Sequence, residues 1–202
     1  MAPATAIDQR TLHKLSGQPD TVLVGPPATG PAGQPTPRKD ILGSRRVARL
    51  YEYWSSKRGG RPMPARSDID PGEIKPLLPY LLISELSDEP VRVRYRLAGA
   101  RVVEAFGYNI TGHWLHELTV VGGVEAWTSI YERVRRTCAP VLGVSEALLG
   151  RIKAFDCPWA VLPLSSDGER VDQCLEIEDW NTVRPLARYN DDDLRWFLRI
   201  SA

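Results

Sequence analysis

Cysteine is scarce in this chain, and long apolar runs are absent from it. Cys138, Cys157 and Cys174 form an odd number with no close spacing, which argues against a disulfide framework and favours a reducing compartment. No apolar run reaches the ~20 residues that a bilayer-spanning helix needs. The first residues also lack the charged and apolar regions of a secretory signal. We therefore expect a cytoplasmic protein.

Net charge is also small, because 26 Lys and Arg residues stand against 25 Asp and Glu residues. This balance excludes a chain that binds polyanions over its whole surface. The sequence contains no G-x-S-x-G, no Gly-rich phosphate loop and no kinase signature. No other recognisable catalytic set of residues is present. We therefore predict that the protein is not an enzyme.

The 202 residues divide into four parts by composition. Residues 25–37 are almost entirely Gly, Pro, Ala, Thr and Gln, so we expect residues 1–39 to form a disordered tail. The other predicted parts are a helical N-terminal extension at 40–79, a core at 80–182, and a C-terminal segment with a short helix at 183–202.

The extension carries the clearest helical periodicity in the sequence. Asp40 is a suitable N-cap, and Gly59-Gly60 is a typical C-terminal stop, so we predict a helix over 41–58. One apolar stripe runs along this helix. Its members are Val47, Leu50, Tyr51 and Trp54. A second, short helix is expected to begin at Asp70-Pro71.

The core alternates runs of strands with a run of helices. Residues 91–98 (VRVRYRLA) alternate strictly, with Val91, Val93, Tyr95 and Leu97 on one face. The other expected strands lie at 80–87, 141–149, 153–164 and 171–180. Short helices are expected over 99–118 and a longer helix over 124–138. The order predicts an α+β fold, a five-stranded antiparallel sheet with helices on one face.

Two segments resemble the PAS domain family. The stretch 95–118 (YRLAGARVVEAFGYNITGHWLHEL) is similar to the passage from the second PAS strand into the helical cleft, with Gly107-Tyr108, Gly112 and Glu117-Leu118 in place. Residues 50–86, from LYEYW through the PARSDIDP motif to ISEL, resemble the opening of a bacterial PAS subfamily found largely in alphaproteobacteria. The resemblance covers roughly residues 41 to 180. It implies the PAS fold and a sensory or scaffold role, without naming a ligand.

In PAS proteins a small ligand, or packed side chains, fill the cleft between sheet and helices. The resemblance implies these lining residues here: Tyr95, Leu97, Val103, Phe106, Trp127, Tyr131 and Leu175. The flavin-binding cysteine of light-sensing PAS domains is missing from residues 109–112, so we expect no cofactor. His113 and His116 lack a third ligand, so we predict no metal site. Cys157 and Cys174 are expected to be buried.

The predicted function is that of a single-domain sensory protein that binds a small ligand or a partner protein and passes the signal to another chain. The apolar stripe, with Val47, Leu50, Tyr51 and Trp54, is the predicted interface of a homodimer. One alternative is a ligandless dimerisation or interaction module. Another is a regulator that binds nucleic acid through the basic segment 45–66, although the aromatic residues of that segment favour a core role.

Overall fold

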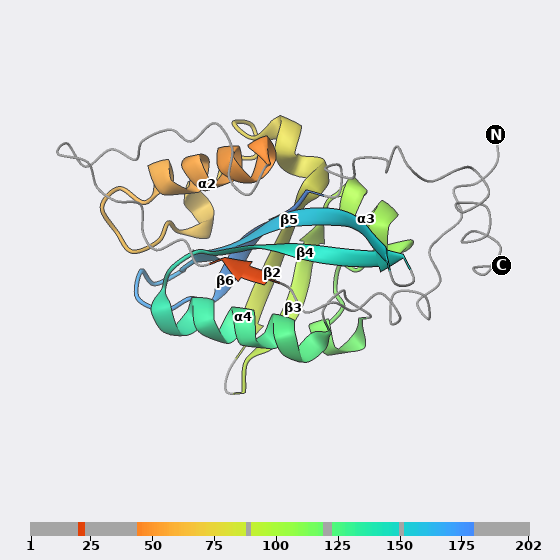
Figure 1. Cartoon of the computed structure of the whole chain (residues 1–202). Coiled ribbons are helices and arrows are strands. Elements are labelled where there is room, and N and C mark those ends of the chain that lie inside the picture. Colours follow the sequence, from red (N-terminus) through yellow and green to blue (C-terminus); the bar gives the residue numbers. More distant parts are fainter. Residues whose placement is uncertain (1–19, 23–43, 88–89, 119–122, 150–151, 180–202) are drawn as a thin grey trace.

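The structure, a computed structural model, describes residues 20–22, 44–87, 90–118, 123–149 and 152–179. Its elements are shown in Figure 1. In chain order they are β1 (Asp20–Val22), α2 (Arg45–Lys57), η1 (Arg66–Asp68), η2 (Lys75–Tyr80), β2 (Leu81–Ser87), β3 (Arg92–Ala98), α3 (Ala100–Phe106), η3 (Leu115–Glu117), α4 (Val124–Thr137), β4 (Val141–Leu149), β5 (Ile152–Leu164) and β6 (Gln173–Glu178). The predicted helix within 183–202 lies outside the described residues.

One antiparallel sheet organises the fold, with the strand order β1-β4-β5-β6-β2-β3. The five strands predicted from the sequence are confirmed, each within two residues of its expected ends. The first and last of them, β2 and β6, pair with each other. The sixth strand, β1, was not expected, because it lies in the segment assigned to the disordered tail. Residues 20–22 pair with 142–144 of β4. Strand β4 would otherwise be an edge whose main-chain groups pair readily with any extended segment.

The hairpin of β2 and β3 contains an irregularity that breaks the predicted alternation of β3. Ser84 aligns with Tyr95, but the preceding Ile83 aligns with Leu97, so one extra residue, Arg96, is accommodated in β3. A bulge of this kind reverses the direction of the side chains that follow it. Leu97 therefore does not share a face with Tyr95, and it is 42% exposed.

The prediction of helices on one face holds for the core helix α4, whereas α2, from the predicted N-terminal extension, covers the opposite face of the sheet. In Figure 1, α4 packs below the sheet and α2 packs above it. The predicted longer helix is confirmed as α4, with four buried residues on the face toward the sheet: Trp127, Ile130, Tyr131 and Val134. The predicted helix over 41–58 is also confirmed, but it begins at Arg45. Its N-cap is Ser44, whose Oγ accepts a hydrogen bond from the Val47 amide at 3.1 Å.

The apolar stripe of α2 is buried within its own chain, which corrects the predicted homodimer interface. Val47, Leu50, Tyr51 and Trp54 are all at most 5% exposed, and they belong to the hydrophobic core. The Nε1 of Trp54 donates a hydrogen bond to the carbonyl oxygen of Pro163 in β5 at 2.7 Å. The physical reason is that the second face of the sheet is itself apolar and needs a cover. The homodimer stays a prediction, without this stripe as its surface.

The segment between α2 and β2 follows its sequence signals only in part. Asp70 does organise a turn, since its Oδ1 accepts a hydrogen bond from the Gly72 amide at 2.7 Å. The helix that follows is the 3-10 helix η2, which begins at Lys75 and contains Pro76 and Pro79. Proline lacks the amide that an α-helix needs, so the tighter, shorter form is adopted. In the described residues, no helix is long and apolar enough to cross a membrane.

Candidate functional site

A polar cluster lies inside the core, between the sheet and α4. Its centre is Glu176, which sits in the middle of β6 and is 3% exposed. One carboxylate oxygen accepts a hydrogen bond from the hydroxyl of Tyr131 in α4 at 2.6 Å. The other accepts a hydrogen bond from the hydroxyl of Ser84 in β2. The hydroxyl of Tyr95 in β3 lies 3.4 Å from that of Tyr131. The cluster thus joins three strands or helices to one carboxyl group.

The environment of Glu176 favours its neutral form. Burial raises the pKa of this carboxyl from about 4.5 to about 7, against the opposing effect of the hydroxyls of Ser84 and Tyr131. Burial also raises the pKa of Tyr131 and of Tyr95 well above the usual value, and the nearby Glu176 adds to both shifts. Among the described residues, no lysine or arginine pairs with Glu176. Near neutral pH the proton on Glu176 is therefore easily gained or lost.

Two tryptophans pack against each other on the same face of the sheet. The rings of Trp127 in α4 and Trp159 in β5 are tilted against each other, with their centroids 5.0 Å apart. Trp159 lies across Gly143 in β4, where an added Cβ atom would come within 2.3 Å of the tryptophan ring. Residue 143 must therefore be glycine for the indole to occupy this place.

Two buried polar atoms on this face have no hydrogen-bond partner in the part of the chain that the structure describes. They are the Nε1 of Trp159 and the Oγ of Ser145 in β4. Ser145 aligns with Cys157 and Gly143 with Trp159, so both side chains stand on the face of the sheet that α4 covers. A buried polar group without a partner costs about 1–3 kcal/mol. The site therefore has unused capacity to donate and accept hydrogen bonds.

Three of the predicted cleft residues are brought together here, namely Tyr95, Trp127 and Tyr131. The other four are not part of the cluster. Leu97 is turned away by the bulge in β3. Leu175 adjoins Glu176 in β6 and so points to the opposite face, beneath α2, where it aligns with Ile83 and Leu162.

The remaining two predicted residues lie on the short helix α3, which turns a different face toward the core than expected. Val103 and Phe106 are half-buried, whereas the fully buried residue of this helix is Val102. The ring of Phe106 packs edge-on against that of Tyr108, with 6.5 Å between centroids. Neither residue makes a hydrogen bond or ring contact with the Glu176 cluster among the described interactions.

Sequence reasoning missed Glu176, Ser84, Ser145 and Trp159. The run QCLEIE alternates apolar and polar residues. For a sheet with one solvent-exposed face, this pattern predicts that Leu175 and Ile177 point into the core and that Glu176 points to solvent. A signal to the contrary was present. The runs LLI at 81–83 and WAVL at 159–162 are apolar without alternation, which is typical of strands buried on both faces. With both faces covered, Glu176 has no wet side.

The histidines and cysteines offer no metal centre in the described part of the chain. No group of three or more His, Cys, Asp and Glu side chains there is placed to hold a metal ion. His113 and His116 are exposed, and His113 lies before η3, so the two do not share a helical face. The predicted burial of Cys157 and Cys174 is confirmed, and burial raises the pKa of both thiols well above the usual value.

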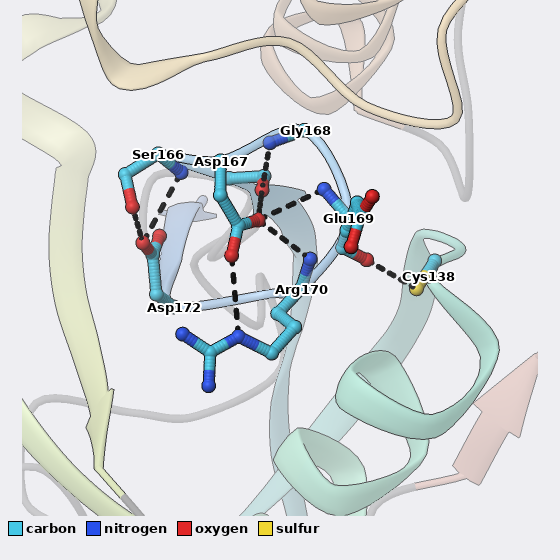
Figure 2. A network of polar contacts seen from close by, with 8 residues as sticks. Cys138, Ser166, Asp167, Gly168, Glu169, Arg170 and Asp172 are labelled. Carbon is cyan, nitrogen blue, oxygen red and sulfur yellow. Dashed lines mark hydrogen bonds and ion pairs between the residues drawn. The ribbon is translucent and has the colours of Figure 1, made fainter.

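The turn between β5 and β6 is tightly hydrogen-bonded and touches the end of α4 (Figure 2). Asp167 accepts hydrogen bonds from the amides of Glu169 and Arg170, both at 2.8 Å, and these bonds lower its pKa. The thiol of Cys138, directly after α4, lies 4.0 Å from the carbonyl oxygen of Glu169. The C-terminal end of α4 is therefore in contact with the turn that precedes the strand of Glu176.

Comparisons with known proteins give a family match and a similar solved structure. No curated protein matches the chain. Among solved structures, the chain is similar to one described as an RNA-binding light-oxygen-voltage receptor, with a TM-score of 0.41 and 15% identity. That match covers 68% of this chain and 40% of the other, so the chain spans less than half of that protein's length. The family profile described as PAS domain matches residues 43–177, which is well over half of the sequence. The chain belongs to the PAS domain family.

Proposed function

We propose that this protein is a non-catalytic sensory module that binds a small molecule between the sheet and α4 and passes the signal to another protein chain. PAS domains are sensory signalling modules, and this chain has the sheet and the covering helix of the family. The observation that carries the ligand proposal is the pair of unpartnered polar atoms, Trp159 Nε1 and Ser145 Oγ, on the face of the sheet that α4 covers. A ligand that offers one oxygen or nitrogen atom to each would satisfy both.

The hydrogen bond between α4 and the sheet gives a route by which ligand binding would change the position of α4. Tyr131 belongs to α4 and donates a hydrogen bond to Glu176 of the sheet, so the position of α4 depends on that bond. A ligand that competes for either group changes the balance between two arrangements of α4 on the sheet. The partner chain would then recognise one of the two arrangements.

The test compares two serines that differ only in whether their hydroxyl is paired. Purified full-length protein is examined by native mass spectrometry for a bound small molecule, in the wild type and in S145A. We expect S145A to bind the small molecule at least about tenfold more weakly than the wild type. The ligand-free variant should have a free energy of unfolding about 1 kcal/mol higher, because an unpaired buried hydroxyl is removed.

The matched control is S84A, which removes a hydroxyl that donates to Glu176. It should instead lower the free energy of unfolding by about 1 kcal/mol or more. A wild-type protein that carries no small molecule, or an S145A variant that binds it as tightly as the wild type, would contradict the proposal. The former result would favour a ligandless interaction module.

A further inference from the structure

A hollow lies at the start of α2, away from the Glu176 cluster. Its volume is about 480 Å³, within the range of small-molecule sites. Three arginines, Arg45, Arg46 and Arg49, stand around it, and Pro76 and Leu77 supply an apolar wall. This combination of several cations and an apolar surface is distinct from the cluster under α4.

The three arginines are not equivalent. Arg46 is neutralised by Asp179, with 2.9 Å between guanidinium nitrogen and carboxylate oxygen, and its guanidinium stacks over the ring of Tyr80 at 4.4 Å. Asp179 is itself buried and also accepts a hydrogen bond from Ser44 at 2.6 Å. The acidic group of the hollow is therefore already used, and it holds Arg46 in place.

Arg45 and Arg49 have no acidic partner among the described residues, and both are exposed. They are four residues apart on one helix, so their side chains are neighbours on the same face. The first turn of α2 contains no acidic residue, although the positive end of a helix favours one. Two adjacent, unpaired cations at this place repel each other unless an anion lies between them.

The rest of the basic segment 45–66 is arranged differently. Lys57 pairs with Glu73 at 2.7 Å, and Arg61 pairs with Asp68 at 2.7 Å. Arg58 lies over the ring of Trp54, with 5.5 Å to its centroid. Arg66 has a backbone partner, the carbonyl oxygen of Ile69 at 3.3 Å. Arg58 and Arg66 also lack an acidic partner among the described residues, but neither lines the hollow. The unpaired cations are therefore separated along the segment and do not form the continuous stripe that a nucleic-acid backbone requires.

We propose that this hollow binds a small organic phosphate, with the phosphoryl group between Arg45 and Arg49 and the organic part against Pro76 and Leu77. A phosphoryl group carries up to two negative charges and accepts paired hydrogen bonds from guanidinium groups. Inorganic phosphate alone would leave the apolar wall of the hollow without a contact. This site is independent of the ligand proposed for the space under α4.

The experiment is a calorimetric titration of the full-length protein with phenyl phosphate, inorganic phosphate and succinate. We expect phenyl phosphate to bind about tenfold or more tightly than either of the others, because only it uses both the arginines and the apolar wall. R45Q/R49Q should weaken phenyl phosphate binding by at least about tenfold. The control R133Q/R136Q removes the same charge from α4 and should leave binding unchanged.

Thermal unfolding of both double variants confirms that they fold. Equal weakening in the two double variants would show a nonspecific effect of net charge and overturn the proposal. Equal affinity for phenyl phosphate and inorganic phosphate would overturn the assignment of the apolar wall. A short DNA duplex is titrated as a fourth ligand. Absence of binding for the three small probes, or a loss in R45Q/R49Q seen only with the duplex, would also overturn the proposal.

Discussion

Replacing Glu176 with glutamine should remove a pH dependence of stability that the wild type shows near neutrality. The carboxyl titrates at about pH 7 in the folded chain and near 4.5 in the unfolded chain. Between these values the folded state holds a proton that the unfolded state releases. The stabilisation from the protonated carboxyl is therefore complete below about pH 4.5, and it is lost as the pH rises through about 7.

The size of the effect follows from the same two values. Each unit of difference in pKa corresponds to about 1.4 kcal/mol, so the wild type should lose ~3 kcal/mol of unfolding free energy between about pH 4.5 and about pH 8. Glutamine resembles the protonated form and keeps partners in the hydroxyls of Ser84 and Tyr131, which donate and accept. E176Q should thus match the wild type near pH 5 and exceed it near pH 8.

Urea unfolding followed by tryptophan fluorescence at several pH values measures this difference. The control is E85Q, which removes a carboxylate that lies 39% exposed on the neighbouring strand and pairs with Arg96. The difference between wild type and E85Q should stay constant over the same pH range, within the small value of an exposed ion pair. If the free energies of unfolding of wild type and E176Q change in parallel with pH, then Glu176 does not titrate near neutrality as a buried carboxyl without a cationic partner.

Three further predictions concern core packing and the turn between β5 and β6. W54A should lower the free energy of unfolding by about 3–5 kcal/mol without changing the oligomeric state seen by light scattering, because Trp54 is buried in its own chain; a change from dimer to monomer in a fully folded variant would contradict this. G143A should lower the free energy of unfolding by about 1–3 kcal/mol, because its Cβ atom would meet the Trp159 ring. An unchanged free energy in chemical denaturation would refute this close approach. D167A should increase amide hydrogen exchange at Glu169 and Arg170 relative to the matched variant D68A, which removes a carboxylate elsewhere; equal exchange in the two would show that Asp167 does not hold the turn.

The sequence predicted the elements of this fold well, because their signals are local. The alternation of 91–98, the stripe of α2 and the turn at 165–168 each follow from a few neighbouring residues. The errors arose where distant segments decide. The face to which Leu97 points depends on a bulge in the pairing with β2, and the use of Trp54 depends on an apolar sheet face more than a hundred residues away.

The candidate site was predicted less completely for the same reason. Tyr95, Trp127 and Tyr131 were recognised because large aromatic residues on the inner sides of a strand and a helix suggest a shared core. Glu176 was not, because α2 covers the opposite face of the sheet and packs over its neighbours Leu175 and Ile177, which leaves Glu176 on the face that α4 buries. Ser145 was not, because a serine in a strand carries no local sign of lacking a partner.

Strand β5 lies between α2 and α4, and this position limits how its sequence can change. Every residue from Cys157 to Ser165 is buried. Alternate side chains enter two different cores, with Trp159 against α4 and its neighbour Ala160 on the side of α2. Pro158 and Pro163 also stand in this strand, and their carbonyl oxygens accept hydrogen bonds from Asp179 and Trp54. No position in this stretch offers solvent to a charged replacement, so mutational scanning should find it the least tolerant segment of the described chain.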